Sequence, residues 1–305
     1  MLTMAIDIGG SSAKIASVDD GKIVNATRVA HPPIVSDLDH IERAVEQLLS
    51  QAPRTRAVGI AIPGSVTPEG RGMRLAHGKL QQLRDMDLVG WSERRFGLPA
   101  IVENDGRAAG WGEYTHGVGR GASSLLTLCF GTGIGASVVV DGHLLGGAHG
   151  AAGILAGHQR IQSRGPSCVC GGVGCWESVA SGWALARDVH SIDPQAWTSS
   201  GRTFADLAMM ASTNHAAATL RSDYLSAWAV GITNLIHVLD VERVVLTGGM
   251  MADAHSFLPE LRSLVSGQLW DLSTGPAIEV AHDVWNSVTL GLSSLAEAHL
   301  GGGHR

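Results

Sequence analysis

The chain has 305 residues, of which 45% are hydrophobic and 16% charged, and its formal net charge is −6. The length predicts two lobes or domains, and the absence of a basic cluster argues against nucleic acid as a main partner. No apolar run reaches membrane length and the first residues lack a signal-peptide pattern, so we expect a cytoplasmic protein with no membrane partner.

The predicted elements alternate between strands and helices along the first half of the chain. In order, they are strands at 2–8, 13–18 and 22–30, a helix at 37–51 capped by Ser36, strands at 57–62 and 99–104, and a helix at 106–114. The turns between the first three strands are Gly-Gly-Ser-Ser and Asp20-Gly21, both typical of hairpins.

The same pattern restarts in the second half. It comprises strands at 123–130 and 136–140, a turn at Asp141-Gly142, a long helix at 216–239, a strand at 243–247 and a closing helix at 285–300. Two three-strand openings, each with a glycine turn after its first strand, predict a duplicated α/β lobe with a cleft between the copies.

The glycine turns lie in "DIGGSSAK" (7–14) and "FGTGIGAS" (130–137). Each places backbone N–H groups between two strands, where they can cup phosphate oxygens. "GTGIGA" also fits a dinucleotide-binding pattern, but that pattern requires a following helix, whereas a strand is predicted here. One such turn could be purely structural, whereas two in duplicated lobes favour a shared nucleotide.

The segment "SCVCGGVGCWE" (167–177) contains three of the four cysteines. Cys168, Cys170 and Cys175 have the spacing C-x-C-x4-C, and His158 precedes them by ten residues. We therefore predict a Cys3His zinc site, with three reduced, buried thiols as the alternative. Cys129 lies in the apolar segment "SLLTLCF" and is expected to be a core residue.

These segments together resemble the ROK family of sugar kinases and repressors, within the actin-like ATPase and hexokinase superfamily. The matching segments are "DIGGSSAK", "GIAIPG", "ENDGRAAGWGE", "GTGIGASVVVDGHLLGGAHGAAG", "GHQRI", "CVCGGVGCWESVASG" and "LTGGM". The resemblance implies a two-lobed actin-like ATPase (ribonuclease-H-like) α/β fold with an interlobe cleft. The implied lobes are residues 1–115, with helix 286–300 packing back on them, and residues 116–285, which include the zinc loop 158–175.

The resemblance also implies transfer of the γ-phosphoryl group of ATP to a sugar hydroxyl, usually at C6. Asp105 would be the catalytic base, Asn104 would hold a ring hydroxyl, and Gly64 would let the chain pass close to the sugar. The alternative for Asn104 and Asp105 is a helix cap.

The nucleotide site implied by the resemblance uses both glycine turns. Asp7 would lie near Mg2+ and the ATP phosphates, and Lys14 stands where the family has a basic residue after the same turn. The remaining residues expected along the nucleotide are Gly9, Gly10, Ser11, Gly131, Thr132, Gly133, Gly248 and Gly249.

A closed Cys3His site leaves no open coordination position, so its zinc would be structural. Clamping the loop would orient His158 and Glu177 at the sugar pocket, where Glu177 could accept hydrogen bonds from hydroxyls. The alternative for Glu177 is an exposed carboxylate at the start of a helix, where the helix dipole favours it.

Two departures from the family pattern concern the substrate. Leu155 stands where the family usually has a sugar-binding glutamate, and His77, with Lys79 nearby, stands where an asparagine is usual. These changes put ordinary glucose in doubt and favour an amino or acylamino sugar, an unusual hexose or a cyclitol.

The alternative function is a non-catalytic sugar-binding regulator, because the family includes repressors. Those carry a DNA-binding segment before the first glycine turn, which here begins within ten residues of Met1. We therefore expect a sugar kinase that does not bind nucleic acid. The resemblance also implies a homodimer.

Overall fold

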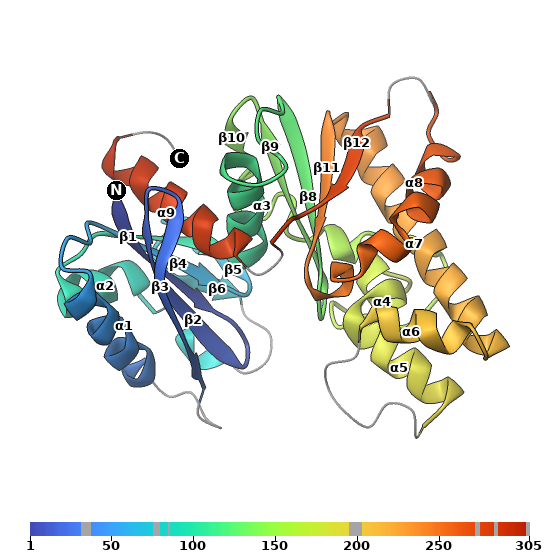
Figure 1. Ribbon diagram of the computed structural model, residues 1–305, viewed down its shortest axis with the longest axis horizontal. Helices are drawn as coiled ribbons and strands as arrows, with labels where there is room; N and C mark the ends of the chain where they lie inside the picture. Colours follow the sequence, from blue (N-terminus) through green and yellow to red (C-terminus); the bar gives the residue numbers. More distant parts are fainter. Residues whose placement is uncertain are drawn as a thin grey trace.

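The computed structural model shows two five-stranded sheets standing side by side (Figure 1). Helices cover the outer face of each sheet, and two further helices lie between the sheets. The structure describes residues 1–31, 38–75, 80–84, 86–194, 203–271, 275–283 and 286–302.

The first sheet is formed near the N-terminus. Its strands are β1 (Leu2–Ile8), β2 (Ser12–Asp19), β3 (Lys22–Ala30), β4 (Val58–Ile62) and β7 (Ala100–Asn104). They are arranged in the order β3-β2-β1-β4-β7, with β1 to β3 antiparallel and β1, β4 and β7 parallel. Asp20 and Gly21 both have positive φ, which suits the tight turn between β2 and β3.

The second sheet repeats this arrangement. Its strands are β8 (Ser124–Phe130), β9 (Ile134–Val140), β10 (His143–Leu144), β11 (Arg243–Thr247) and β12 (Ala277–Val280). Their order, β10-β9-β8-β11-β12, matches the first sheet strand for strand, with the same pattern of antiparallel and parallel pairs. Asp141 and Gly142 repeat the positive φ values of the first hairpin. The predicted duplication is therefore confirmed.

The remaining elements are helices and one short hairpin. The α-helices are α1 (Asp39–Gln51), α2 (Leu88–Phe96), α3 (Asp105–Thr115), α4 (Trp176–Ala180), α5 (Gly182–Ile192), α6 (Phe204–Ala211), α7 (His215–Leu239), α8 (Leu258–Ser266) and α9 (Ser287–Leu300). The short elements are the hairpin of β5 (Ser65–Val66) and β6 (Met73–Leu75) and the 3-10 turns η1 (Gln81–Leu83), η2 (Ala156–His158), η3 (Gly249–Met251) and η4 (Ala254–Ser256).

Each sheet has its own hydrophobic core. Met4 and Ile6 of β1 pack in one core with residues of α1 and α2, and we call this part the first lobe. Phe130 of β8 and Trp228 of α7 belong to the core of the second lobe, which α4 to α8 complete. Alternate residues of β1 and β8 face these cores, as expected for strands with one face covered by helices.

The helices α3 and α9 cross closely between the two sheets (Figure 1). A Cβ at Gly291 would lie 1.8 Å from the carbonyl oxygen of Ala108, and one at Gly112 would lie 2.0 Å from that of Ser287. α9 packs on β1 and β4, and α3 packs on β8 and β9. The predicted domain limits at residue 115 stay a prediction.

Some local expectations differ from the structure. The first helix begins at Asp39 rather than at residue 37. Its N-cap residue, Leu38, makes no side-chain capping bond, and the predicted cap Ser36 lies outside the described residues. The sequence pattern did not indicate α2, α5, α6, α8 or β12.

Within the described part of the chain, no helix has the length and hydropathy needed to cross a membrane.

Candidate active site between two glycine hairpins

Asn104 and Asp105 lie where β7 ends and α3 begins. Asn104 Oδ1 accepts a 3.1 Å hydrogen bond from the backbone N–H of Arg107, so Asn104 does cap α3. Its Nδ2 donates to the Gly64 carbonyl and to Asp105 Oδ1, each at 3.0 Å. The amide therefore links the turn after β4 to the Asp105 carboxylate, and its Oδ1 retains a second lone pair for another donor.

The Asp105 carboxylate is held through one of its two oxygens. Oδ1 accepts from Asn104 Nδ2 and, at 2.8 Å, from the backbone N–H of Gly106. Among the described residues, no other residue donates to Oδ2. Burial raises the pKa of Asp105, and hydrogen bonds from the Gly106 N–H, the Asn104 amide and the backbone N–H of Asp105 itself oppose the rise. A fixed carboxylate with one open oxygen and increased basicity can accept a proton from a nearby hydroxyl.

Three charged side chains form a row across the first sheet. Asp7 of β1 is directly opposite Lys14 of β2, which is opposite Arg28 of β3, so all three project from the same face. Burial and then the charge of Asp105 raise the pKa of Asp7 to about 6, while the two cations oppose this rise. Lys14 Nζ also donates to Asn286 Oδ1 at 2.6 Å, which connects the row to the start of α9.

Three predicted nucleotide-site glycines border open space. A Cβ added at Gly10, Gly131 or Gly249 would have no atom of the described residues within 4 Å apart from its immediate chain neighbours. Gly248 differs, because its φ is +95° and a Cβ there would lie 2.5 Å from the Phe130 carbonyl oxygen. Only glycine fits the backbone conformation and the close carbonyl at position 248, whereas the other three positions leave the main chain accessible to a ligand.

The second hairpin, residues 131–133, is fixed by neighbouring helices. The N–H groups of the first two residues of α5 donate to the carbonyls of Gly131 and Thr132 at 3.0 and 3.1 Å. Glu177 Oε2 accepts from the N–H of Ile134 at 3.0 Å. Glu177 does lie at the start of a helix, α4, but it is half-buried rather than exposed as the alternative expected. One of its oxygens supports the hairpin rather than facing a sugar.

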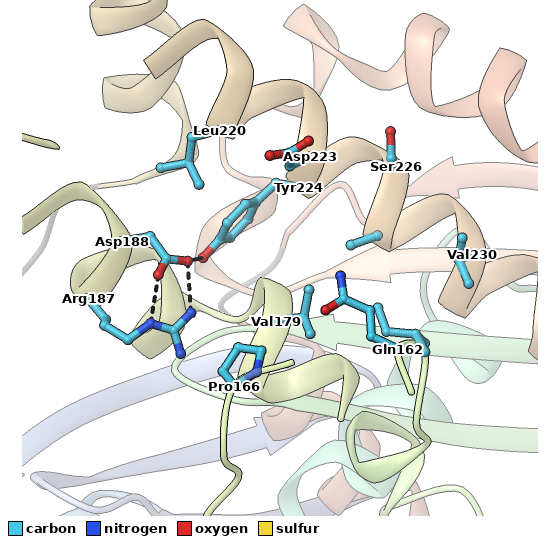
Figure 2. A pocket seen from close by; sticks show the side chains of 12 residues that line it. Gln162, Pro166, Val179, Arg187, Asp188, Leu220, Asp223, Tyr224, Ser226 and Val230 are labelled. Atoms are coloured by element: carbon cyan, nitrogen blue, oxygen red, sulfur yellow. Dashed lines mark hydrogen bonds and ion pairs between the residues drawn. The ribbon is translucent and has the colours of Figure 1, made fainter. Parts of the chain in front are cut away.

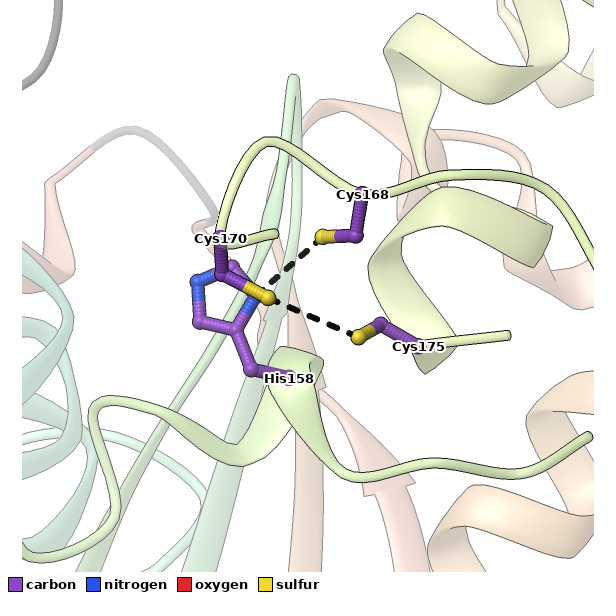
Figure 3. Close-up of side chains that lie close together, drawn as sticks. All are labelled: His158, Cys168, Cys170 and Cys175. Carbon is purple, nitrogen blue, oxygen red and sulfur yellow. Dashed lines mark hydrogen bonds between the residues drawn. The ribbon is translucent and has the colours of Figure 1, made fainter. Parts of the chain in front are cut away.

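The structure brings the four predicted metal ligands together (Figure 3). The ligand atoms of His158, Cys168, Cys170 and Cys175 all lie within 4.8 Å of one another. Cys170 Sγ is 3.6 Å from Cys175 Sγ, and Cys168 Sγ is 3.5 Å from His158 Nδ1. A tetrahedral zinc with Zn–S bonds of about 2.3 Å and a Zn–N bond of about 2.0 Å needs separations of about 3.8 and 3.5 Å. The donor set and its spacing fit such an ion.

The thiols of this cluster differ in their environments. Burial raises the pKa of Cys168 and raises that of Cys175 to about 12, whereas a hydrogen bond from the backbone of Gly172 lowers that of Cys170. Cys168 and Cys175 are buried and Cys170 is exposed, so the three thiols are not all buried as that alternative expected. Positive φ values at Gly171 and Gly174 let the loop fold around the three sulfurs.

Cys129 is not a core residue, contrary to expectation. It lies between Leu128 and Phe130, which face the core of the second lobe, and its half-buried side chain lies on the opposite face of β8. Burial, followed by the charges of Asp105 and Asp7, raises the pKa of Cys129 to about 12. Strand alternation could have shown this placement, because neighbouring residues point to opposite faces.

The predicted sugar side is described only in part. Gly64 has a φ of 141°, which favours glycine, and its carbonyl accepts the bond from Asn104. Leu155 precedes the 3-10 turn η2 and is 55% exposed. His77 and Lys79 lie outside the described residues.

A separate pocket of about 470 Å³ lies beside α5 and α7 in the second lobe (Figure 2). The Arg187 guanidinium donates to both carboxylate oxygens of Asp188 at 2.6 and 2.9 Å, and Tyr224 Oη donates to Asp188 at 3.0 Å. These polar groups satisfy one another, and none of the predicted site residues lines the pocket. We therefore place the candidate active site at Asp105 and the two hairpins.

Comparison with protein families covers almost the whole chain. The sequence model of the ROK family matches residues 3–299. The chain belongs to the ROK family. The resemblance seen in the sequence segments is therefore confirmed.

Three proteins show how closely this ROK chain resembles known members. N-acetylmannosamine kinase of Citrobacter koseri is 31% identical over 298 residues, covering 97% of this chain and 99% of the relative. The ROK hexokinase from Thermus thermophilus has a TM-score of 0.83 at 25% identity, covering 99% and 100% of the two chains. A ROK family glucokinase from Streptomyces griseus, in complex with glucose and AMPPNP, has a TM-score of 0.79 at 27% identity, covering 97% and 99%. The predicted actin-like fold class is confirmed.

Proposed function

We propose that this ROK protein transfers the γ-phosphoryl group of ATP to a hydroxyl of a hexose or hexose-like substrate, with the 6-hydroxyl as the expected acceptor. The observation that carries the proposal is Asp105, whose Oδ1 is fixed by two N–H donors while Oδ2 is open. The kinases among its relatives support the same class of reaction.

Asp105 would act as the general base. Its Oδ2 would take the proton of the acceptor hydroxyl as that oxygen bonds to the γ-phosphorus, and the bond to the bridging oxygen would break to release ADP. A positioned base contributes about 10²- to 10⁴-fold in rate. The bonds from Asn104 and Gly106 would prevent rotation of the carboxylate, so that Oδ2 stays aligned with the acceptor.

The nucleotide would bind between the two hairpins. A Cβ at Gly10 or Gly131 would meet no atom of the described residues within 4 Å, so their main chain would accept an approaching phosphate, and Gly249 would border the adenosine in the same way. Asp7 would hold Mg2+, which prefers oxygen ligands and would offset phosphate charge when bound. Lys14, beside Asp7, would contact the phosphates from the first sheet.

The sugar would lie on the Gly64 and Asn104 side of Asp105. Asn104 Oδ1, the second oxygen of Glu177, His158 and His77 are the proposed hydroxyl contacts. The exposed Leu155 offers an apolar surface in place of a carboxylate. An acylamino sugar, an unusual hexose or a cyclitol would gain from that surface, whereas a sugar requiring a charged hydrogen bond there would lose affinity.

The Cys3His cluster would hold a structural zinc. Its four protein ligands fill a tetrahedral coordination shell, so the ion would have no position left for a substrate. The ion would stabilise the thiolates and fix the loop that leads into Glu177. A homodimer and a cytoplasmic location remain predictions.

The test is ADP release with Mg·ATP against aldoses, amino sugars, N-acyl sugars, ketoses and cyclitols. We would compare the native protein with Asp105→Asn and with the control Asp141→Asn. Asp141 is an exposed turn residue with φ of 49°, a conformation that Asn also tolerates. We expect turnover on at least one acceptor, a loss of about 10²- to 10⁴-fold in kcat for Asp105→Asn, and native turnover for the control.

Two outcomes would contradict parts of the proposal. Saturable sugar binding by calorimetry without turnover on any acceptor would favour the regulator alternative. Glucose as clearly the best acceptor would refute the interpretation of Leu155 while leaving the kinase reaction intact.

A further inference from the structure

We propose that His31 is a positioning residue that holds the first glycine hairpin, residues 9–12, in the shape that receives the nucleotide phosphates. The inference rests on the proposed ATP site. His31 follows β3 directly and lies 22 residues from the hairpin's first glycine.

His31 binds two carbonyl groups of the hairpin. Its Nε2 lies 2.7 Å from the Gly9 carbonyl oxygen, and its backbone N–H donates to the Ser11 carbonyl at 3.0 Å. A carbonyl oxygen only accepts hydrogen bonds, so Nε2 must carry a hydrogen. The Gly9 N–H is also occupied, because it donates to the Ser12 carbonyl at 3.0 Å. With these groups bonded within the protein, the main chain at Gly10 remains open to a ligand.

His40 of α1 contacts the other ring nitrogen of His31. His31 Nδ1 is 2.8 Å from His40 Nε2, and the two rings are perpendicular with centroids 5.1 Å apart. A neutral His31 accepts from His40 through Nδ1, whereas a protonated His31 donates to it. The donor to Gly9 is present in both states, so the bond to the hairpin does not depend on which state is populated.

The second hairpin has an equivalent bond made by different atoms. Gly131 follows β8 as Gly9 follows β1, and its carbonyl accepts from the backbone N–H of Gly182 at 3.0 Å. The first carbonyl of each hairpin is therefore held from outside the hairpin. In the second lobe this donor is main chain, whereas in the first lobe it is the side chain of His31, which a substitution can remove.

The test compares three substitutions of His31 that separate its two ring nitrogens. His31→Ala removes both side-chain bonds. The amide nitrogen of Gln in His31→Gln reaches the position of Nε2 and can still donate to Gly9. The shorter side chain of His31→Asn reaches only the position of Nδ1, so it can contact His40 but not Gly9. His40→Ala is the control that keeps the Gly9 bond.

The measurements are calorimetric affinity for Mg·AMPPNP without sugar, the KM values for ATP and sugar, and the thermal midpoint. For His31→Ala and His31→Asn we expect nucleotide affinity to fall and the KM for ATP to rise about 2- to 12-fold, as for one lost hydrogen bond. The KM for the sugar should not change. His31→Gln should stay within about twofold of the native protein, and so should His40→Ala.

Equal nucleotide affinity in His31→Asn and the native protein would overturn the proposal. So would equal weakening in His31→Gln and His31→Asn, because the ring itself rather than its Nε2–H would then matter. If His31→Ala does not fold, the Gln and Asn variants still decide between these outcomes. A native protein that binds no Mg·AMPPNP would instead refute the ATP site of the proposed function.

Discussion

Replacing Asp7 by Asn is expected to stabilise the ligand-free protein and to abolish its phosphoryl transfer. Burial and the charge of Asp105 raise the Asp7 pKa from 3.8 to about 6. Between these two pH values the folded protein binds a proton that the unfolded chain has lost. The stability contributed by Asp7 is therefore fully present below pH 4 and is lost as the pH rises through about 6.

The size of this effect follows from the pKa difference. A rise from 3.8 to about 6 corresponds to at most about 3 kcal/mol, at about 1.4 kcal/mol per pH unit. Asn is uncharged and nearly isosteric, so Asp7→Asn should recover this energy at pH 8. For a chain of 305 residues, that is an increase of about 5 °C in the thermal midpoint.

The assay is thermal unfolding of both proteins at pH 8 and pH 4, together with ADP release at pH 8. Asp19→Asn is the control, because Asp19 lies on the neighbouring strand and its side chain is 57% exposed. This substitution should shift the thermal midpoint by about 1 °C or less. The midpoint difference between Asp7→Asn and the native protein should nearly disappear at pH 4.

A lower midpoint for Asp7→Asn at pH 8 would refute this reasoning about burial. The same conclusion would follow from a midpoint difference that is equal at both pH values. Native turnover by Asp7→Asn would refute only the proposed role of Asp7 at the metal and phosphates.

Two further predictions concern stability. The purified native protein should contain about one zinc per chain. Cys175→Ser should lose the metal and lower the thermal midpoint, because two thiolates and an imidazole hold zinc less well than three thiolates and an imidazole. A native protein purified without zinc, or a Cys175→Ser variant with an unchanged midpoint, would contradict the zinc assignment. Gly291→Ala should lower the free energy of unfolding by about 1–3 kcal/mol in denaturant titrations, because its Cβ would lie 1.8 Å from the Ala108 carbonyl oxygen. Gly301→Ala, whose Cβ would meet nothing closer than 3.6 Å, is the matched control, and an equal loss in both variants would argue against the close helix crossing.

The sequence by itself determined the features that depend on neighbouring residues. Apolar segments at 2–8 and 123–130 identified the central strands, and the pairs at Asp20 and Asp141 identified the hairpin turns, because strand composition and turn chemistry are local. The spacing of Cys168, Cys170 and Cys175 likewise identified the candidate metal site, since these residues are close in the chain as well as in space.

The role proposed for Asp105 came from the family resemblance rather than from local chemistry. An Asn-Asp pair at the end of a strand is equally a helix cap, and Asn104 does cap α3. Only the tertiary structure showed that the Asp105 carboxylate has one bonded oxygen and one open oxygen, in a buried setting that raises its pKa.

The tertiary structure alone decided which residues meet across the sheets. Residues from different elements form the contact of His31 with Gly9 and the crossing of α3 and α9. Such contacts depend on strand register and helix packing over tens to hundreds of residues, which no local period encodes. They place the charges and hydrogen bonds of the candidate active site, whereas the local pattern fixes only the elements that carry them.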